Sequence, residues 1–60
     1  MFIFTIYDSD HCIVENYPNL ISVVLQADNT VCYTYIDALG CIVTDTYRLD
    51  DGESCSIRRL

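Results

Sequence analysis

The sequence predicts an α+β fold: a single two-layer domain of order ββαββ, in which one helix lies across one face of a four-stranded, mainly antiparallel sheet. Three observations support this prediction. The chain has 60 residues, which is enough for one domain only. Runs of β-branched and aromatic residues near both ends are typical of strands, and an apolar stripe with helical spacing lies between them.

The first predicted element is a β-hairpin. Residues 2–7 are β-branched or aromatic, Asp8-Ser9-Asp10 has the composition of a turn, and residues 12–14 form a second short extended run. Asn16-Tyr17-Pro18 follows and resembles the start of a helix, because a proline in the first helical turn loses no backbone hydrogen bond.

Apolar periodicity predicts one helix over about residues 18–39. Apolar residues recur there at spacings of three and four, as an amphipathic helix requires, namely Leu20, Val24, Ala27, Val31, Tyr35 and Ala38. Gly40 comes directly after the stripe, where a helix often ends in a left-handed conformation that glycine adopts without strain.

A competing interpretation makes the same segment two strands, 21–26 and 31–36, joined through residues 27–30. Their β-branched content favours it, and the whole chain would then be an all-β meander. A third alternative is that Asp28-Asn29-Thr30 breaks the helix into two pieces.

The carboxyl-terminal part predicts a second hairpin. Residues 41–49 form a strand, Asp50-Asp51-Gly52-Glu53 a loop, and residues 55–60 the partner strand. No internal repeat or linker is apparent, so residues 1–60 are predicted to form a single small acidic domain. In a ββαββ sheet the two acidic hairpin turns would lie at opposite ends, about 20 Å apart.

The sequence shows no pattern of an active site, a metal site or a cofactor site. His11 and Cys12 are neighbours on a predicted strand, so their side chains would point to opposite faces. The four cysteines lie 20, 9 and 14 positions apart, without the paired spacing of zinc ligands. No phosphate-binding glycine loop or hydrolase motif is present. We therefore expect a non-enzymatic protein without cofactor or metal.

The amino terminus predicts a cytoplasmic location, and this location predicts the state of the cysteines. The first seven residues lack the basic start and the long apolar run of an export signal or a membrane span. In a cytoplasmic protein the four cysteines, at positions 12, 32, 41 and 55, are expected to be reduced and buried.

Charge is the most informative property for function. Nine acidic residues stand against three arginines and no lysine, which gives a formal net charge of -6. A protein that binds DNA, RNA or an anionic membrane directly would need the opposite sign. The expected partner is a protein with a basic nucleic-acid-binding surface. The residues predicted to contact it are Tyr7, Asp8, Asp10, Tyr33, Asp37, Asp50, Asp51 and Glu53.

The leading functional hypothesis is a small inhibitor or regulator that binds a nucleic-acid-handling protein partly through DNA-like negative charge. Inhibitors of restriction, CRISPR or transcription enzymes from phages and mobile elements are often of this size and charge. The alternative is an adaptor or subunit that binds a protein through the sheet face left uncovered by the helix. That face, or edge pairing by residues 55–60, would also allow a homodimer.

Overall fold

The computed structural model describes all 60 residues. Their regular secondary structure is almost entirely β-strand. Its elements are β1 (Phe2–Tyr7), β2 (Ile13–Leu20), β3 (Ser22–Leu25), the 3-10 turn η1 (Ala27–Asn29), β4 (Thr30–Ile36), β5 (Ile42–Arg48) and β6 (Ser54–Arg59). There is no α-helix, so the predicted α+β fold with a helix over 18–39 is wrong.

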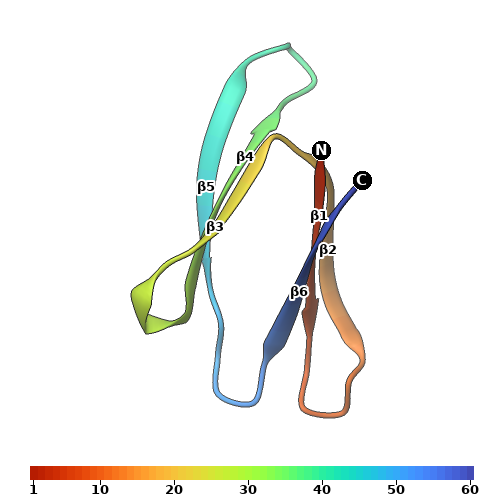
Figure 1. Ribbon diagram of the computed structural model, residues 1–60, viewed down its shortest axis with the longest axis vertical. Helices are drawn as coiled ribbons and strands as arrows, with labels where there is room; N and C mark the ends of the chain where they lie inside the picture. The colour runs from red at the N-terminus through yellow and green to blue at the C-terminus, as the bar shows by residue number, and fades with distance from the viewer.

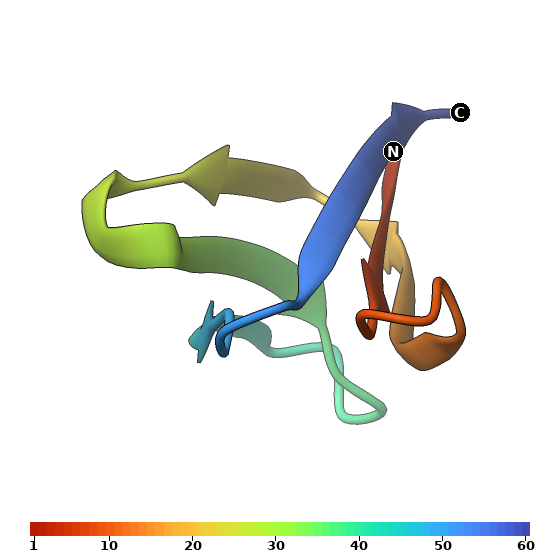
Figure 2. The ribbon, with the colours of Figure 1, turned by 90° about the horizontal axis from the view of Figure 1, so that it is seen from below.

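The strands form two three-stranded antiparallel sheets that are shown side by side in Figure 1. Sheet 1 has the order β2-β1-β6, and sheet 2 has the order β3-β4-β5. The chain crosses from sheet 1 to sheet 2 through Ile21 alone and returns through residues 49–53. Seen from below, the two sheets stand at a steep angle to each other, and the two termini lie close together (Figure 2).

The segment predicted as a helix is a β-hairpin, as the competing interpretation proposed. β4 alternates Val31, Tyr33 and Tyr35 on the inner face with small or polar residues between them, which is the two-residue period of a strand. Asp28 and Asn29 have φ values of 63° and 58°, and two left-handed residues in a row form the tight turns of hairpins. A helix cannot pass through such a turn.

The structure contains an internal repeat that the sequence analysis did not detect. The β1–β2 and β4–β5 hairpins are related by a shift of 29 positions. Identical residues occupy Thr5, Asp8, Cys12, Ile13 and Val14 in the first hairpin and Thr34, Asp37, Cys41, Ile42 and Val43 in the second. Each hairpin supplies the central strand of one sheet, so the fold is close to a duplication of one three-stranded unit.

The core lies between the inner faces of the two sheets and is small. Phe4 and Ile6 from β1, Leu20 from β2, and Val31 and Tyr33 from β4 form one buried apolar cluster. Only six of the 60 residues are buried, whereas eleven large apolar side chains are at least 39% exposed. A domain of this size has a narrow stability margin, so each of these five core residues matters for folding.

Candidate functional site

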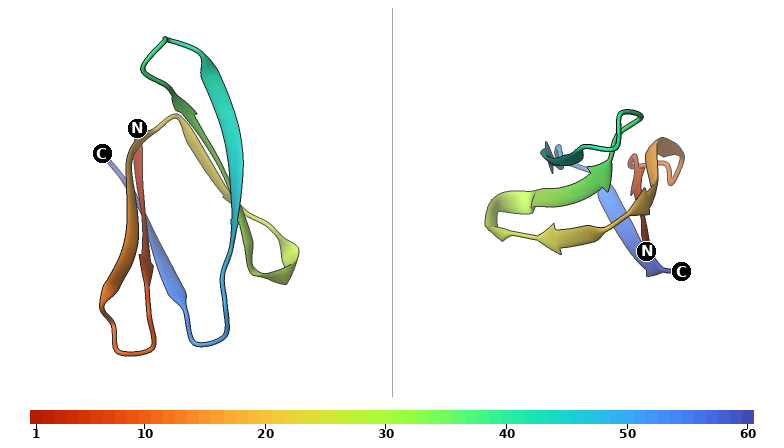
Figure 3. Two further views of the ribbon diagram at one scale, coloured as in Figure 1. Left: turned by 180° about the vertical axis from the view of Figure 1, so that it is seen from behind. Right: turned by 90° about the horizontal axis from the view of Figure 1, so that it is seen from above.

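The two acidic turns lie at the same end of the molecule, not about 20 Å apart as predicted. Strands β1 and β6 are antiparallel neighbours, and Tyr7 at the end of β1 pairs with Ser54 at the start of β6. The loop after β1 and the loop before β6 are therefore adjacent, and a Cβ added to Gly52 would lie 3.4 Å from the Ser9 Cβ. Figure 1 and the left-hand view of Figure 3 show both loops at the lower end.

We call this part of the surface the acidic end and define it by five carboxylates. They are Asp8, Asp10, Asp50, Asp51 and Glu53. The earlier expectation failed because it paired residues 41–49 with residues 55–60 as a second hairpin. That prediction is wrong, since β5 pairs with β4 in sheet 2 and β6 pairs with β1 in sheet 1. The charge is concentrated rather than spread over the domain.

Two carboxylates of the acidic end shape its loops. Asp8 Oδ1 accepts hydrogen bonds of 2.9 Å from the backbone N–H groups of Asp10 and Cys12. Glu53 Oε1 accepts a 2.8 Å bond from the backbone N–H of Asp50, and both carboxylate oxygens lie 3.2 Å from the Tyr47 hydroxyl, which donates. These bonds fix the two loops against the end of the sheets.

The other three carboxylates face solvent. Asp10, Asp50 and Asp51 are exposed, and their side chains take no part in the hydrogen bonds that close the loops. Two of the three arginines lie elsewhere, because Arg58 and Arg59 pair with Ile3 and Phe2 at the far end of sheet 1, and the third, Arg48, ends β5 two residues before Asp50. The acidic end therefore keeps free negative charge that is available to a partner.

The remaining predicted contact residues are distributed unequally. Tyr7 is half-buried at the acidic end, and its hydroxyl lies 3.5 Å from Ser56 Oγ. Asp37 closes the β4–β5 loop at the opposite end, where its Oδ1 accepts 2.9 Å bonds from two backbone N–H groups. Tyr33 is only 6% exposed, so its ring belongs to the core.

A tyrosine cluster between the sheets was not anticipated from the sequence. The rings of Tyr17 and Tyr33 are stacked with their centroids 4.8 Å apart, and those of Tyr33 and Tyr35 are 6.1 Å apart. Burial, together with the hydroxyl of Tyr17, raises the pKa of Tyr33 to about 12. The sequence did contain a sign of this cluster, because Tyr33 and Tyr35 are two residues apart and would lie on the same face of a strand. The helical interpretation placed them on different faces.

The rim of this cluster forms the one pocket of the protein, with a volume of about 400 Å³. It lies where β2 ends beside β4. Its lining residues are Tyr17, Pro18, Asn19, Leu20, Tyr33, Tyr35 and Ile36. The lining is mainly apolar and aromatic and contains no charged side chain, so the pocket differs in chemistry from the acidic end.

The cysteines are all free, but they are not the buried residues that the sequence predicted. Cys12 and Cys41 are exposed in the two equivalent hairpin loops, and Cys32 and Cys55 are half-buried. Burial raises the pKa of the Cys55 thiol. No three His, Cys, Asp or Glu side chains are grouped closely enough to hold a metal ion. The structure has no helix with the length and apolar character to cross a membrane.

Comparisons with protein-family models, with curated proteins and with solved structures find no match to this chain.

Proposed function

We propose that this chain is a small, non-enzymatic protein of the cytoplasm, and that it inhibits or regulates another protein by binding it through the acidic end. The expected partner is a nucleic-acid-handling protein, and the contacted surface is the basic groove in which that protein holds DNA or RNA. The observation that carries the proposal is the collection of five carboxylates, from two loops far apart in the sequence, on one end of the molecule.

The chemistry of the acidic end fits this role. Arginine and lysine side chains that bind phosphate oxygens also bind carboxylates, and a concentrated negative field speeds association with a basic surface. Asp10, Asp50 and Asp51 are exposed and lie on loops fixed by Asp8 and Glu53. Little ordering of the loops would then be required on binding, which favours affinity.

The exposed carboxylates can be tested with charge-neutral variants. Asp10→Asn with Asp51→Asn removes two charges from the acidic end, while Asp28→Asn with Asp45→Asn removes two exposed charges from sheet 2 and its turn. Asparagine keeps the shape of aspartate and tolerates the left-handed conformation at position 28. The two double variants therefore have the same net charge but differ in where the charge is lost.

The experiment is affinity capture from the lysate of the native host with wild type and both variants. We expect the wild type and the sheet 2 variant to retain a basic nucleic-acid-binding protein at low salt, to release it at high salt and to lose it to added DNA or RNA. The acidic-end variant should retain much less. Equal retention by both variants, or capture that resists salt and nucleic acid, would contradict the proposal.

A further inference from the structure

The pocket between β2 and β4 is lined by tyrosine rings that the core does not fully cover. Tyr17, Tyr33 and Tyr35 stack one after another, and Tyr33 in the middle is buried while the other two are half-buried. Tyr35 ends the row, since its ring stacks on Tyr33 and on no other aromatic ring. The second face of the Tyr35 ring is therefore not used by the aromatic cluster.

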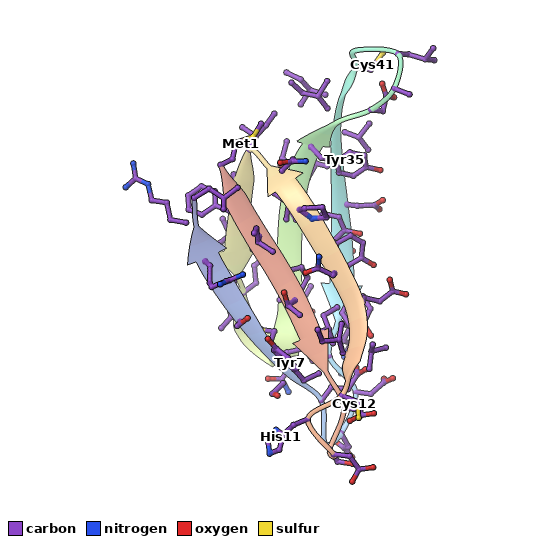
Figure 4. The ribbon with its side chains drawn as sticks, turned by 90° about the vertical axis from the view of Figure 1, so that its right-hand side faces the viewer. Met1, Tyr7, His11, Cys12, Tyr35 and Cys41 are labelled. Carbon is purple, nitrogen blue, oxygen red and sulfur yellow. The ribbon has the colours of Figure 1, made fainter.

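The pocket has the size of a binding site for one side chain of a partner. Its volume of about 400 Å³ is at the lower end of the range of about 300–1,000 Å³ that ligand sites occupy. Figure 4 shows Tyr35 at the end of the molecule opposite to His11 and Cys12, which belong to the loop of the acidic end. The pocket is thus a surface feature separate from the acidic end.

The charges beside the pocket are negative. Asp45 is the strand partner of Tyr33, so its exposed carboxylate lies on the same face of sheet 2 as the tyrosines. Burial, the hydroxyl of Tyr17 and the carboxylate of Asp45 all raise the pKa of Tyr33. Asp37 follows Tyr35 by two positions, at the point where β4 ends.

No positive side chain balances these carboxylates within the pocket. Neither an arginine nor a histidine is among the lining residues. Arg59 is the arginine related to the pocket by strand pairing, and the whole of β1 separates it from Leu20 in the pocket wall. The pocket therefore combines a neutral, aromatic lining with a negative surrounding field, which attracts cations and repels anions.

An arginine side chain fits this combination best. Its guanidinium is planar, is hydrated more weakly than an ammonium group and stacks on aromatic faces, where the ring quadrupole attracts it. Its methylene chain packs on apolar surface such as that of Pro18 and Leu20. The amide oxygen of Asn19 and the tyrosine hydroxyls of the lining are acceptors for guanidinium N–H groups.

We propose that the pocket between β2 and β4 binds an arginine side chain of a partner protein, with the guanidinium stacked on the ring of Tyr35. The inference does not rest on the proposed function, because it concerns the end of the molecule opposite to the acidic end. Its test uses a short peptide and no captured partner, so a failure here leaves the proposal for the acidic end untouched.

The test is an NMR titration of the full chain with the tripeptide Gly-Arg-Gly, whose termini are blocked so that the guanidinium is its only charge. The backbone N–H signals of Asn19, Leu20 and Ile36 report on the pocket, and those of Asp10 and Asp51 report on the acidic end. Physiological salt limits unspecific attraction to the exposed carboxylates. We expect saturable shifts of the pocket signals and small, unsaturated shifts at the acidic end.

Two control peptides separate the contributions of charge and shape. In Gly-citrulline-Gly a neutral urea of the same shape replaces the guanidinium, and the affinity should fall about tenfold because the attraction to the ring and to the carboxylates is lost. Gly-Lys-Gly keeps the charge but not the planar group, and it should bind about threefold more weakly than the arginine peptide.

Variants of Tyr35 test the ring itself. Tyr35→Leu keeps an apolar lining but removes the aromatic face, so the affinity for Gly-Arg-Gly should fall about fivefold. The matched control Tyr35→Phe keeps the ring and should bind nearly as well as the wild type. The dispersion of the N–H signals shows in the same spectra whether each variant is folded.

Three outcomes would overturn the proposal, and the first two need only the wild type. The first is an absence of saturable shifts at Asn19, Leu20 and Ile36, including the case in which only the acidic end responds. The second is equal binding of the citrulline or the lysine peptide, because the pocket would then not select a guanidinium. The third is a folded Tyr35→Leu variant that binds Gly-Arg-Gly as tightly as Tyr35→Phe does.

Discussion

Asp8 and Asp37 have the same structural role in the two halves of the chain. In each loop the carboxylate accepts the N–H groups two and four residues further on, and the backbone N–H of the aspartate bonds to the carbonyl of a cysteine four residues later. The residue before the cysteine, His11 or Gly40, has a positive φ. The short carboxylate of an aspartate reaches the backbone N–H groups of its own turn, which explains why both loops have an aspartate at this position.

Replacement of Asp8 separates its structural role from its charge. We expect Asp8→Ala to lower the free energy of unfolding by about 1–2 kcal/mol, because two backbone N–H groups lose their acceptor. Asp8→Asn retains an acceptor oxygen and should lose clearly less. Urea unfolding followed by circular dichroism measures both. Equal losses would mean that the charge, rather than the geometry of the loop, stabilises this turn.

The raised pKa of Tyr33 predicts a loss of stability at alkaline pH. Its pKa is raised from 10.0 to about 12 in the folded protein, mainly by burial. The neutral phenol is thus favoured by folding, so this contribution to stability is complete below about pH 10 and is lost as the pH rises through 12. Tyr47 shifts in the same direction through burial and the carboxylate of Glu53.

Tyr33→Phe should therefore reduce the decline in stability between about pH 9 and about pH 11, because it removes one of the buried phenols that ionise on unfolding. Urea titrations of wild type and variant at both pH values provide the measurement. If the stability of the variant fell as steeply as that of the wild type, ionisation of Tyr33 would not be the cause of the decline.

The β3–β4 hairpin is the element on which the prediction of the fold failed. The apolar residues of 18–39 satisfy a helical spacing only if the apolar residues between them are disregarded, and β4 in fact alternates apolar and small or polar side chains. Asp28 and Asn29 were recognised as possible breakers, but their left-handed turn depends on strands on both sides that pair. Local sequence could not decide this, because the pairing with β5 completes sheet 2.

The turn of this hairpin can be tested directly. Asn29→Gly should be neutral or slightly stabilising, since glycine adopts a positive φ without strain. Asn29→Val should cost about 1–2 kcal/mol of unfolding free energy, because a β-branched residue is poorly tolerated in a left-handed conformation. Thermal unfolding of the two variants provides the comparison. A similar loss in both would show that the side chain of Asn29, and not the backbone conformation, stabilises the turn.

At the scale of the whole molecule the charge is polarised. Five carboxylates lie at one end, where Ile13 is also exposed, the exposed Ile36, Leu39 and Ile42 lie at the other, and six residues of the domain are buried. Mutual repulsion within the acidic end opposes folding and is screened by salt.

Stability should therefore rise with ionic strength. We expect a gain of about 0.5–1 kcal/mol in unfolding free energy between about 0.01 M and about 1 M sodium chloride. The Asp10→Asn, Asp51→Asn double variant should gain less than the Asp28→Asn, Asp45→Asn variant, which leaves the acidic end intact. Urea unfolding at both salt concentrations tests this, and equal gains in the two variants would show that the charges of the acidic end do not interact.

Composition and local pattern determined that the chain is acidic, that both of its ends form strands, and that Asp8–Asp10 and Asp50–Glu53 lie in loops between strands. These properties depend on neighbouring residues. Tertiary structure alone decided that the middle of the chain is a hairpin, that β6 pairs with β1, and that the two acidic turns meet at one end. The physical reason is that strand pairing joins residues far apart in the sequence, so the position of every turn depends on which strand lies beside it.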